Sequence, residues 1–286
     1  MENNTYKTSI NGIKVPWLIY GTAWKKENTT LLVEKAIKKG FRGIDTAGQP
    51  KHYQEDLVGV ALHNLFKEGF KREDIYLQTK FTPLSGQGQG LIPYDIGAPI
   101  EDQVRQSFEA SKKNLQTSYV DAYILHSPLQ PYATLMKVWN AMQDIFNKKE
   151  ALELGISNCY NLDVLKQLYA HAKIKPAIVQ NRFHQESKYD AELRLWCDSK
   201  GIIYQSFWSL TANPHILNNE LVLQISRHYK KTSEQIFFRY LTQCEIVPLT
   251  GTWSSEHMQE DLSILDFTLS KEEVISISDL LKLVYF

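Results

Sequence analysis

The sequence alternates short β-rich runs with helical patterns from one end to the other. A buried run at 75–81, for example, precedes helical spacing over 101–115, and a run at 120–126 precedes helical spacing over 132–146. Apolar residues at three- and four-residue intervals indicate helices, whereas short apolar runs bounded by turn residues indicate buried strands. Eight such units in 286 residues predict a closed (β/α)8 barrel of the TIM type.

The predicted elements account for most of the chain. The strands lie at 16–23, 41–47, 75–81, 120–126, 152–157, 177–183, 201–207 and 245–250. The helices lie at 29–39, 101–115, 132–146, 162–172, 191–200, 221–229, 234–243, 256–265 and 271–281. Gly40 follows the first of these helices, in the position where a glycine commonly ends a helix.

An open, doubly wound parallel sheet is the alternative architecture. Such a sheet usually carries G-x-G-x-x-G between a strand and a helix, and this chain has no such motif. Its one glycine cluster, at 86–90, lies within a proline-containing loop at 82–100. No linker or shift in composition divides the chain. We therefore expect a single domain over 1–286, with loop 82–100 as an insertion that shapes a pocket.

The composition narrows the possible partners. Lys and Arg number 32 and Asp and Glu also number 32, so no net charge favours nucleic acid or an anionic membrane. No run approaches the roughly 20 apolar residues of a membrane span, and the polar first ten residues contain no targeting signal. Cys159, Cys197 and Cys244 have no metal-binding spacing and indicate a reducing compartment. We expect a cytoplasmic monomer or weak oligomer without a bound metal.

Polar or aromatic residues occupy the predicted carboxyl ends of seven strands. In a barrel these ends meet at one mouth, where the chemistry takes place. One polar strand end usually marks only the point where the chain leaves the core, but seven in succession indicate a site. The residues are Asp45, Lys80, His126, Ser157 with Asn158, Gln180, Phe207 and Thr250.

Several segments resemble motifs of the aldo-keto reductase family. The resemblance extends from Ile13 to about Leu269, and the loops at 49–55 and 82–100 resemble a divergent, fungal-like branch. It implies a barrel enzyme that reduces a small aldehyde or ketone with NADPH or NADH. The matching segments, in the family's order, are 40–47, 78–80, 120–128, 154–158, 179–181, 235–240 and 247–252.

The resemblance implies a catalytic tetrad formed by Asp45, Tyr53, Lys80 and His126. Hydride delivered to a carbonyl carbon leaves negative charge on the oxygen, which must then receive a proton. The usual pKa of tyrosine, about 10, is too high for an easy donor, and an adjacent Lys80 cation would lower it. Asp45 would keep Lys80 charged and in place, while His126 would orient the carbonyl oxygen or share the proton.

The position of the tyrosine leaves an alternative open. Counting back from Val58 and Gly59 places the family's tyrosine on His52, whereas Tyr53 is the only phenol nearby. The loop at 48–53 is longer than is usual in the family, so either side chain could project into the site. We predict that Tyr53 is the proton donor, with His52 as the alternative acid. Trp24, His52 and His126 would line the substrate pocket.

The resemblance also implies residues that contact a nicotinamide cofactor. Ser157, Asn158 and Gln180 would hold its carboxamide, and Phe207 would stack on its ring where the family usually has tyrosine. The other implied cofactor contacts are Gly21, Thr22, Asp45, Trp208, Ser209, Leu210, Pro248, Leu249, Thr250, Gly251, Thr252, His257, Glu260 and Asp261.

The segment that would bind the cofactor's phosphates departs from the family pattern. Leu249 stands where the family often has lysine, and His257 stands where it often has arginine. Those cations usually hold the extra phosphate of NADPH. Backbone N–H groups of 250–252 at a helix start can still bind phosphate. The chain is therefore predicted to accept both NADPH and NADH.

A second hypothesis is a barrel that binds nicotinamide in a regulatory or interaction role, with little turnover. The altered phosphate segment and the shifted tyrosine favour it. The presence of Asp45, Lys80 and His126 favours an active reductase instead. Consumption of NADPH with a panel of aldehydes separates the two hypotheses.

Overall fold

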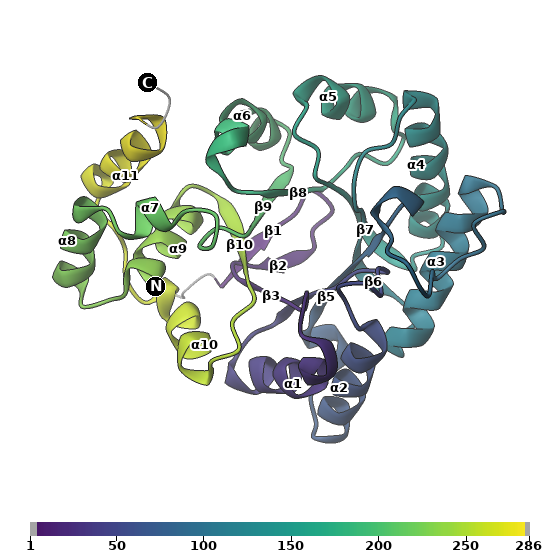
Figure 1. Cartoon of the computed structure of the whole chain (residues 1–286), viewed down its shortest axis with the longest axis horizontal. Coiled ribbons are helices and arrows are strands. Elements are labelled where there is room, and N and C mark those ends of the chain that lie inside the picture. Colours follow the sequence, from purple (N-terminus) through teal and green to yellow (C-terminus); the bar gives the residue numbers. More distant parts are fainter. Residues whose placement is uncertain (1–4, 284–286) are drawn as a thin grey trace.

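The computed structural model describes residues 5–283 and contains a closed barrel of parallel strands inside a ring of helices (Figure 1). The strands pair in the order β10–β3–β4–β5–β6–β7–β8–β9, and every neighbouring pair is parallel. The predicted (β/α)8 barrel is thus confirmed. Its strands are β3 (Ile19–Gly21), β4 (Gly43–Asp45), β5 (Tyr76–Phe81), β6 (Val120–Leu125), β7 (Ala151–Ser157), β8 (Ile178–Arg182), β9 (Ile203–Phe207) and β10 (Ile246–Thr250).

Helices cover the outside of the barrel and enclose the larger apolar core between themselves and the strands. The sequence pattern did not delimit α2, which connects β4 to β5. Within residues 5–283 no helix is long and apolar enough to cross a lipid bilayer. The helices are α1 (Thr29–Lys39), α2 (Glu55–Lys67), α3 (Ile100–Leu115), α4 (Tyr132–Asn147), α5 (Leu162–His171), α6 (Ala191–Ser199), α7 (Pro214–Leu217), α8 (Glu220–Tyr229), α9 (Ser233–Gln243), α10 (Ser255–Leu262) and α11 (Lys271–Leu283).

An antiparallel hairpin, β1 (Tyr6–Thr8) with β2 (Lys14–Pro16), closes the amino end of the barrel. Val15 of the hairpin packs into the apolar cluster inside the barrel, together with Ile19 and Tyr76. The strand predicted at 16–23 is therefore wrong in part, because Pro16 ends β2 and only Ile19–Gly21 forms the barrel strand. With its amino end filled, the barrel leaves its carboxyl end for a site.

Local sequence signals set the helix ends on either side of β10. Helix α9 begins with a capping box, in which the Gln235 N–H donates to Thr232 Oγ1 and the Thr232 N–H donates to Gln235 Oε1. Helix α10 is capped by Ser254, whose hydroxyl oxygen accepts from the Glu256 and His257 N–H groups. These caps fix where β10 starts and where the chain turns away after it.

A buried carboxyl lies inside the barrel on β7. Leu154 and Ile156 of this strand pack in the outer core, so the alternating residue Glu153 points inward, and it is fully buried. Burial raises the pKa of Glu153 to about 8, against the opposing effect of the Ser9 hydroxyl. The folded protein therefore holds this proton up to about pH 8, whereas the unfolded chain releases it near pH 4.5.

Because unfolding releases the Glu153 proton between these two pH values, we expect this group to destabilise the fold as the pH rises. The loss from pH 5 to pH 8 is roughly 3 kcal/mol. Glu153→Gln should remove this dependence and be the more stable protein at pH 8. Urea unfolding of both proteins at the two pH values measures the effect, and an identical pH dependence in wild type and variant would contradict it.

Candidate active site

The carboxyl ends of the strands bring the predicted site residues to one mouth of the barrel. Asp45 ends β4, Ser157 ends β7 and Phe207 ends β9. Lys80 is the penultimate residue of β5, and His126 directly follows β6. Because the strands are parallel and the barrel is closed, residues far apart in sequence face one another across this mouth.

The Asp45–Lys80 pair is the most deeply buried charged feature of the mouth. Lys80 Nζ lies 2.5 Å from Asp45 Oδ1, and the two side chains are only 1% and 4% exposed. The ammonium also donates to the Thr46 carbonyl at 2.9 Å. Burial lowers the pKa of Lys80, while the Asp45 carboxylate opposes that effect. The predicted ion pair is present, and it fixes the position of the lysine.

Two buried glutamines donate to the same carboxylate, and a third buried glutamine connects them. Gln78 and Gln180 each donate to Asp45 Oδ1, at 2.7 and 3.0 Å. Both also donate to Gln205 Oε1 at 2.9 Å, and Gln205 returns a hydrogen bond to Gln78 Oε1 at 3.0 Å. Sequence reasoning missed Gln78 and Gln205. The detectable signal was an amide side chain in the middle of a predicted buried strand.

Tyr53 and His52 occupy different parts of the mouth. The Tyr53 ring centroid lies 5.3 Å from Lys80 Nζ and 6.1 Å from the His126 ring. The His52 ring instead lies against the Trp24 ring, with centroids 3.8 Å apart, and the backbone N–H of Trp24 donates to the backbone carbonyl of His52. The structure thus brings Tyr53, and not His52, beside the lysine. His52 and Trp24 together form a wall of the mouth.

The pKa of Tyr53 is shifted upward, so the expected net lowering of this pKa is wrong. Burial raises the pKa of Tyr53 well above its usual value, and the Asp45 carboxylate raises it further. Since Asp45 contacts Lys80 directly, its negative charge offsets part of the effect that the positive charge of the lysine has on the phenol. Tyr53 is therefore a neutral phenol at pH 7, which is the form that has a proton to donate.

His126 is a neutral imidazole at the edge of the site. Burial lowers its pKa to about 3, and the charges of Lys80 and His52 contribute in the same direction. Its carbonyl accepts from Asn158 Nδ2 at 2.8 Å, and its N–H donates to the Phe81 carbonyl at 2.9 Å. The backbone of the histidine is therefore held by the two neighbouring strand ends.

The residues predicted to hold the nicotinamide carboxamide form a connected group at the end of β7 and on β8. The Ser157 hydroxyl donates to the Gln180 carbonyl at 2.7 Å, and Asn158 Nδ2 contacts Ser157 Oγ at 3.2 Å. Gln180 Nε2 donates to Asp45 and Gln205, so the amide hydrogens of Gln180 are used within the barrel. The side-chain oxygen of Gln180, Oε1, is the atom left to accept from a carboxamide NH2 group. This donor set fits a nicotinamide.

Two glycines, Gly21 and Gly251, lie next to each other where the first and last strands of the barrel end. A Cβ atom on Gly21 would lie 3.5 Å from the Thr250 carbonyl, and one on Gly251 would lie 3.6 Å from the Gly21 carbonyl. Thr22 is buried there and donates through both its N–H and its hydroxyl to the Asp45 carbonyl. These residues, predicted to contact the ribose and phosphates, thus lie together where the first and last barrel strands end.

A lysine that sequence analysis missed lies at the predicted phosphate segment. Lys25 is 2% exposed and donates to the Gly251 carbonyl, and its ammonium lies 5.2 Å from the Trp253 ring centroid. Burial lowers the pKa of Lys25 to about 8. Tyr20 beside it donates to the Thr252 carbonyl at 2.8 Å. The segment therefore contains a cation, although not the lysine that the family often has on its last strand.

The remaining predicted cofactor residues of β10 and α10 differ in how deeply they are buried. Leu249 packs in the apolar cluster inside the barrel, against which Phe207 also packs. Asp261 is buried and accepts from the Thr250 hydroxyl at 2.7 Å, and burial raises its pKa to about 6. His257 is exposed. Pro248 lies within β10, and Glu260 is half-buried on α10.

Of the three predicted cofactor residues that follow β9, one side chain is half exposed and two pack inside the protein. Trp208 is half exposed, and the Arg182 guanidinium lies 4.1 Å from its ring centroid. Ser209 is buried and donates to Ser206 Oγ, and Leu210 packs against the outer core. The side chains of Ser209 and Leu210 are thus occupied within the protein, which leaves the backbone for any cofactor contact there.

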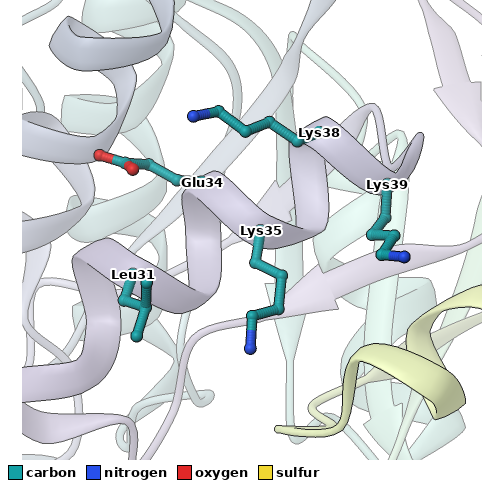
Figure 2. A pocket seen from close by; sticks show the side chains of 5 residues that line it. All are labelled: Leu31, Glu34, Lys35, Lys38 and Lys39. Carbon is teal, nitrogen blue, oxygen red and sulfur yellow. The ribbon is translucent and has the colours of Figure 1, made fainter.

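Two surface hollows lie away from the mouth. One, of 370 Å³, lies along α1 and is lined by Leu31, Glu34, Lys35, Lys38 and Lys39 (Figure 2). Another of 460 Å³ is lined by residues of α6, α9 and α11. Neither includes a residue of the proposed site. Among residues 5–283 no group of three or more histidine, cysteine or acidic side chains is arranged to hold a metal ion.

The fold and the mouth residues together define a class, the barrel oxidoreductases that reduce carbonyl compounds with a nicotinamide cofactor. The chain belongs to the aldo/keto reductase family, whose model matches residues 17–282. The family assignment made from the strand-end motifs is therefore confirmed.

Individual relatives agree with this assignment over almost the whole chain. Glyoxal reductase of Bacillus subtilis (strain 168) is 30% identical over 275 residues, covering 95% of this chain and 91% of that protein. Aldose reductase B of Dictyostelium discoideum is 27% identical, covering 97% and 92%. A solved structure of an aldo/keto reductase from Brucella melitensis has a TM-score of 0.82 and 26% identity, covering 96% and 98%.

Proposed function

We propose that this chain reduces an aldehyde or ketone to an alcohol, with hydride from NADPH or NADH and a proton from Tyr53. One observation supports this most strongly. A neutral phenol, a lysine and a neutral imidazole converge at the barrel mouth, with Lys80 Nζ 5.3 Å and the His126 ring 6.1 Å from the Tyr53 ring centroid. Such a group can protonate an oxygen that becomes negative during the reaction.

Each residue then has a distinct task. When bound, the nicotinamide supplies hydride to the carbonyl carbon. His126 polarises the carbonyl oxygen, and Tyr53 transfers its phenolic proton to that oxygen as negative charge develops. Lys80 stabilises the tyrosinate that remains, because its ammonium lies over the same ring. Asp45 holds Lys80 in place, and water returns the proton to Tyr53 after the alcohol leaves. The same steps run in reverse for alcohol oxidation.

The substrate is a small carbonyl compound that fits beside an aromatic wall. Trp24 and His52 provide that wall, and Trp24 is 52% exposed and therefore accessible to a ligand. Relatives named as a glyoxal reductase and an aldose reductase support a first panel of dialdehydes, sugars and aromatic aldehydes.

The altered phosphate segment predicts weak discrimination between NADPH and NADH. Leu249 is apolar and buried and His257 is exposed, so neither supplies a fixed cation for a 2′-phosphate. Lys25, the cation at this segment, is buried and donates to the Gly251 carbonyl, so a 2′-phosphate gains no fixed charged partner from it. We therefore expect the two dissociation constants to lie within about tenfold of each other. Quenching of tryptophan fluorescence during titration measures both constants. A hundredfold preference for NADPH would contradict this prediction.

Initial rates of NADPH and NADH oxidation across the aldehyde panel test the proposed function. Saturable oxidation with formation of one alcohol per cofactor supports it. Tight cofactor binding without turnover of any carbonyl compound would instead favour the regulatory role. We also propose that the protein works in the cytoplasm. The thiols of Cys159, Cys197 and Cys244 are all free, as is usual in a reducing compartment.

A further inference from the structure

A threonine directly after β5 contacts the imidazole of the proposed site. Thr82 is 1% exposed, and its Oγ1 lies 2.6 Å from His126 Nδ1. Within residues 5–283 the Thr82 hydroxyl makes no other hydrogen bond. Neither the family resemblance nor the strand-end pattern singled out this residue.

The direction of this hydrogen bond follows from the needs of both groups. A neutral imidazole carries its one proton on either Nδ1 or Nε2. If the proton were on Nδ1, the Thr82 hydroxyl would accept, and its own hydrogen would have no acceptor in a buried place. If the proton is on Nε2, the hydroxyl donates to Nδ1 and both groups are satisfied. The second arrangement is therefore favoured.

We propose that Thr82 is a positioning residue, whose hydroxyl donates to His126 Nδ1 and thereby keeps the imidazole proton on Nε2. That nitrogen lies on the edge of the ring away from Thr82, where its N–H can donate to a substrate carbonyl oxygen. The proposal rests on the proposed function for its catalytic meaning, because the hydrogen bond to the substrate matters only if the carbonyl is reduced.

The loop at 82–100 holds the backbone of the same threonine. Tyr94 Oη donates to the Thr82 carbonyl at 2.8 Å, and Gln87 Nε2 donates to it at 3.1 Å. Gln87 also donates to the Gly48 carbonyl at 2.9 Å, so the loop is fastened to the segment before Tyr53. Thr82 thus connects the predicted pocket insertion to the imidazole: the loop fixes its backbone and its side chain fixes the tautomer.

The backbone of His126 does not depend on Thr82, which makes a clean test possible. Asn158 and Phe81 hold the histidine through its carbonyl and its N–H. Thr82→Val keeps the shape of the side chain and removes only the hydroxyl, and Thr82→Ser restores the hydroxyl. Thr242→Val is the matched control, because Thr242 is a buried threonine on α9 whose hydroxyl donates to the Arg239 carbonyl.

The tautomer is read from the ¹⁵N chemical shifts of the His126 ring in the protein without cofactor. We expect at least about 90% of the Nε2–H form in wild type, Thr82→Ser and Thr242→Val, and a mixture in Thr82→Val, since one hydrogen bond biases the equilibrium about tenfold. We also expect kcat/KM for an aldehyde to fall about tenfold in Thr82→Val, with recovery in Thr82→Ser. The dissociation constant for NADPH should stay within twofold.

The outcomes separate this proposal from the proposed function. An Nδ1–H tautomer in wild type, or an unchanged tautomer and kcat/KM in Thr82→Val, would overturn the role of Thr82 even in an active enzyme. Absence of any carbonyl turnover, with the Nε2–H tautomer present and lost in Thr82→Val, would overturn the proposed function while leaving the tautomer assignment standing.

Discussion

Replacing Tyr53 by phenylalanine is expected to lower kcat for carbonyl reduction at least about 100-fold, the usual scale for loss of a general acid. The variant keeps the ring that lies 5.3 Å from Lys80 Nζ and removes only the hydroxyl that carries the proton. Its affinity for the cofactor should be unchanged. Initial rates at saturating aldehyde and cofactor, together with a fluorescence titration, measure both quantities.

His52→Phe is the matched control, because it introduces phenylalanine, as Tyr53→Phe does, at the neighbouring position. It removes the alternative acid but keeps an aromatic ring against Trp24. We expect its kcat to stay within about threefold of wild type. The reverse result, in which His52→Phe loses activity and Tyr53→Phe retains it, would assign the proton to His52.

Removing the buried lysine should damage both activity and stability. Lys80→Met is expected to lower kcat about 1000-fold, because nothing then stabilises the tyrosinate. It also leaves the Asp45 carboxylate buried without its cation, at a cost of roughly 3 kcal/mol in the free energy of unfolding. Gln78 and Gln180 still donate to that carboxylate, which keeps the cost near the lower end of the usual range. Steady-state rates and urea unfolding measure the two effects.

A double variant separates these two effects. Asp45→Asn combined with Lys80→Met removes both charges, so most of the lost stability should return while the activity does not. A stable double variant with restored turnover would mean that the ion pair only supports the fold. A single Lys80→Met variant that keeps more than a tenth of the wild-type kcat would contradict the role of the lysine.

The barrel was predictable because its signal is repeated. Each strand is a short apolar run, and each run is followed by helical spacing, so an error in one unit leaves the rest intact. The strand predicted at 16–23 shows the limit of this signal. Trp17 and Leu18 continue the apolar pattern of β2, although the chain turns there from the hairpin into the barrel.

The strand ends also predicted the position of Asp45, Lys80 and His126, since parallel strands in a closed barrel must deliver their ends to one mouth. Loop residues are different, because a loop has no periodicity that fixes where a side chain points. Sequence counting therefore left Tyr53 and His52 as alternatives. The structure brings Tyr53 beside Lys80 and places His52 against Trp24.

Partners that depend on three-dimensional packing were not predictable. Gln78 and Gln205 are 127 positions apart, and only barrel closure brings their amides together. The pKa of Tyr53 depends on burial and on the Asp45 carboxylate, and a sequence gives no measure of burial at one atom. Lys25 similarly gains its importance from contact with Gly251, at the other end of the chain.

The most direct test of hydride transfer at this site uses NADPH that carries deuterium at both hydrogens of nicotinamide C4, with an aldehyde that the enzyme turns over. The account predicts a product alcohol with one deuterium on the former carbonyl carbon, formed in equal amount to the oxidised cofactor. A protein that binds the labelled cofactor but forms no deuterated alcohol with any aldehyde or ketone of the panel would contradict the account.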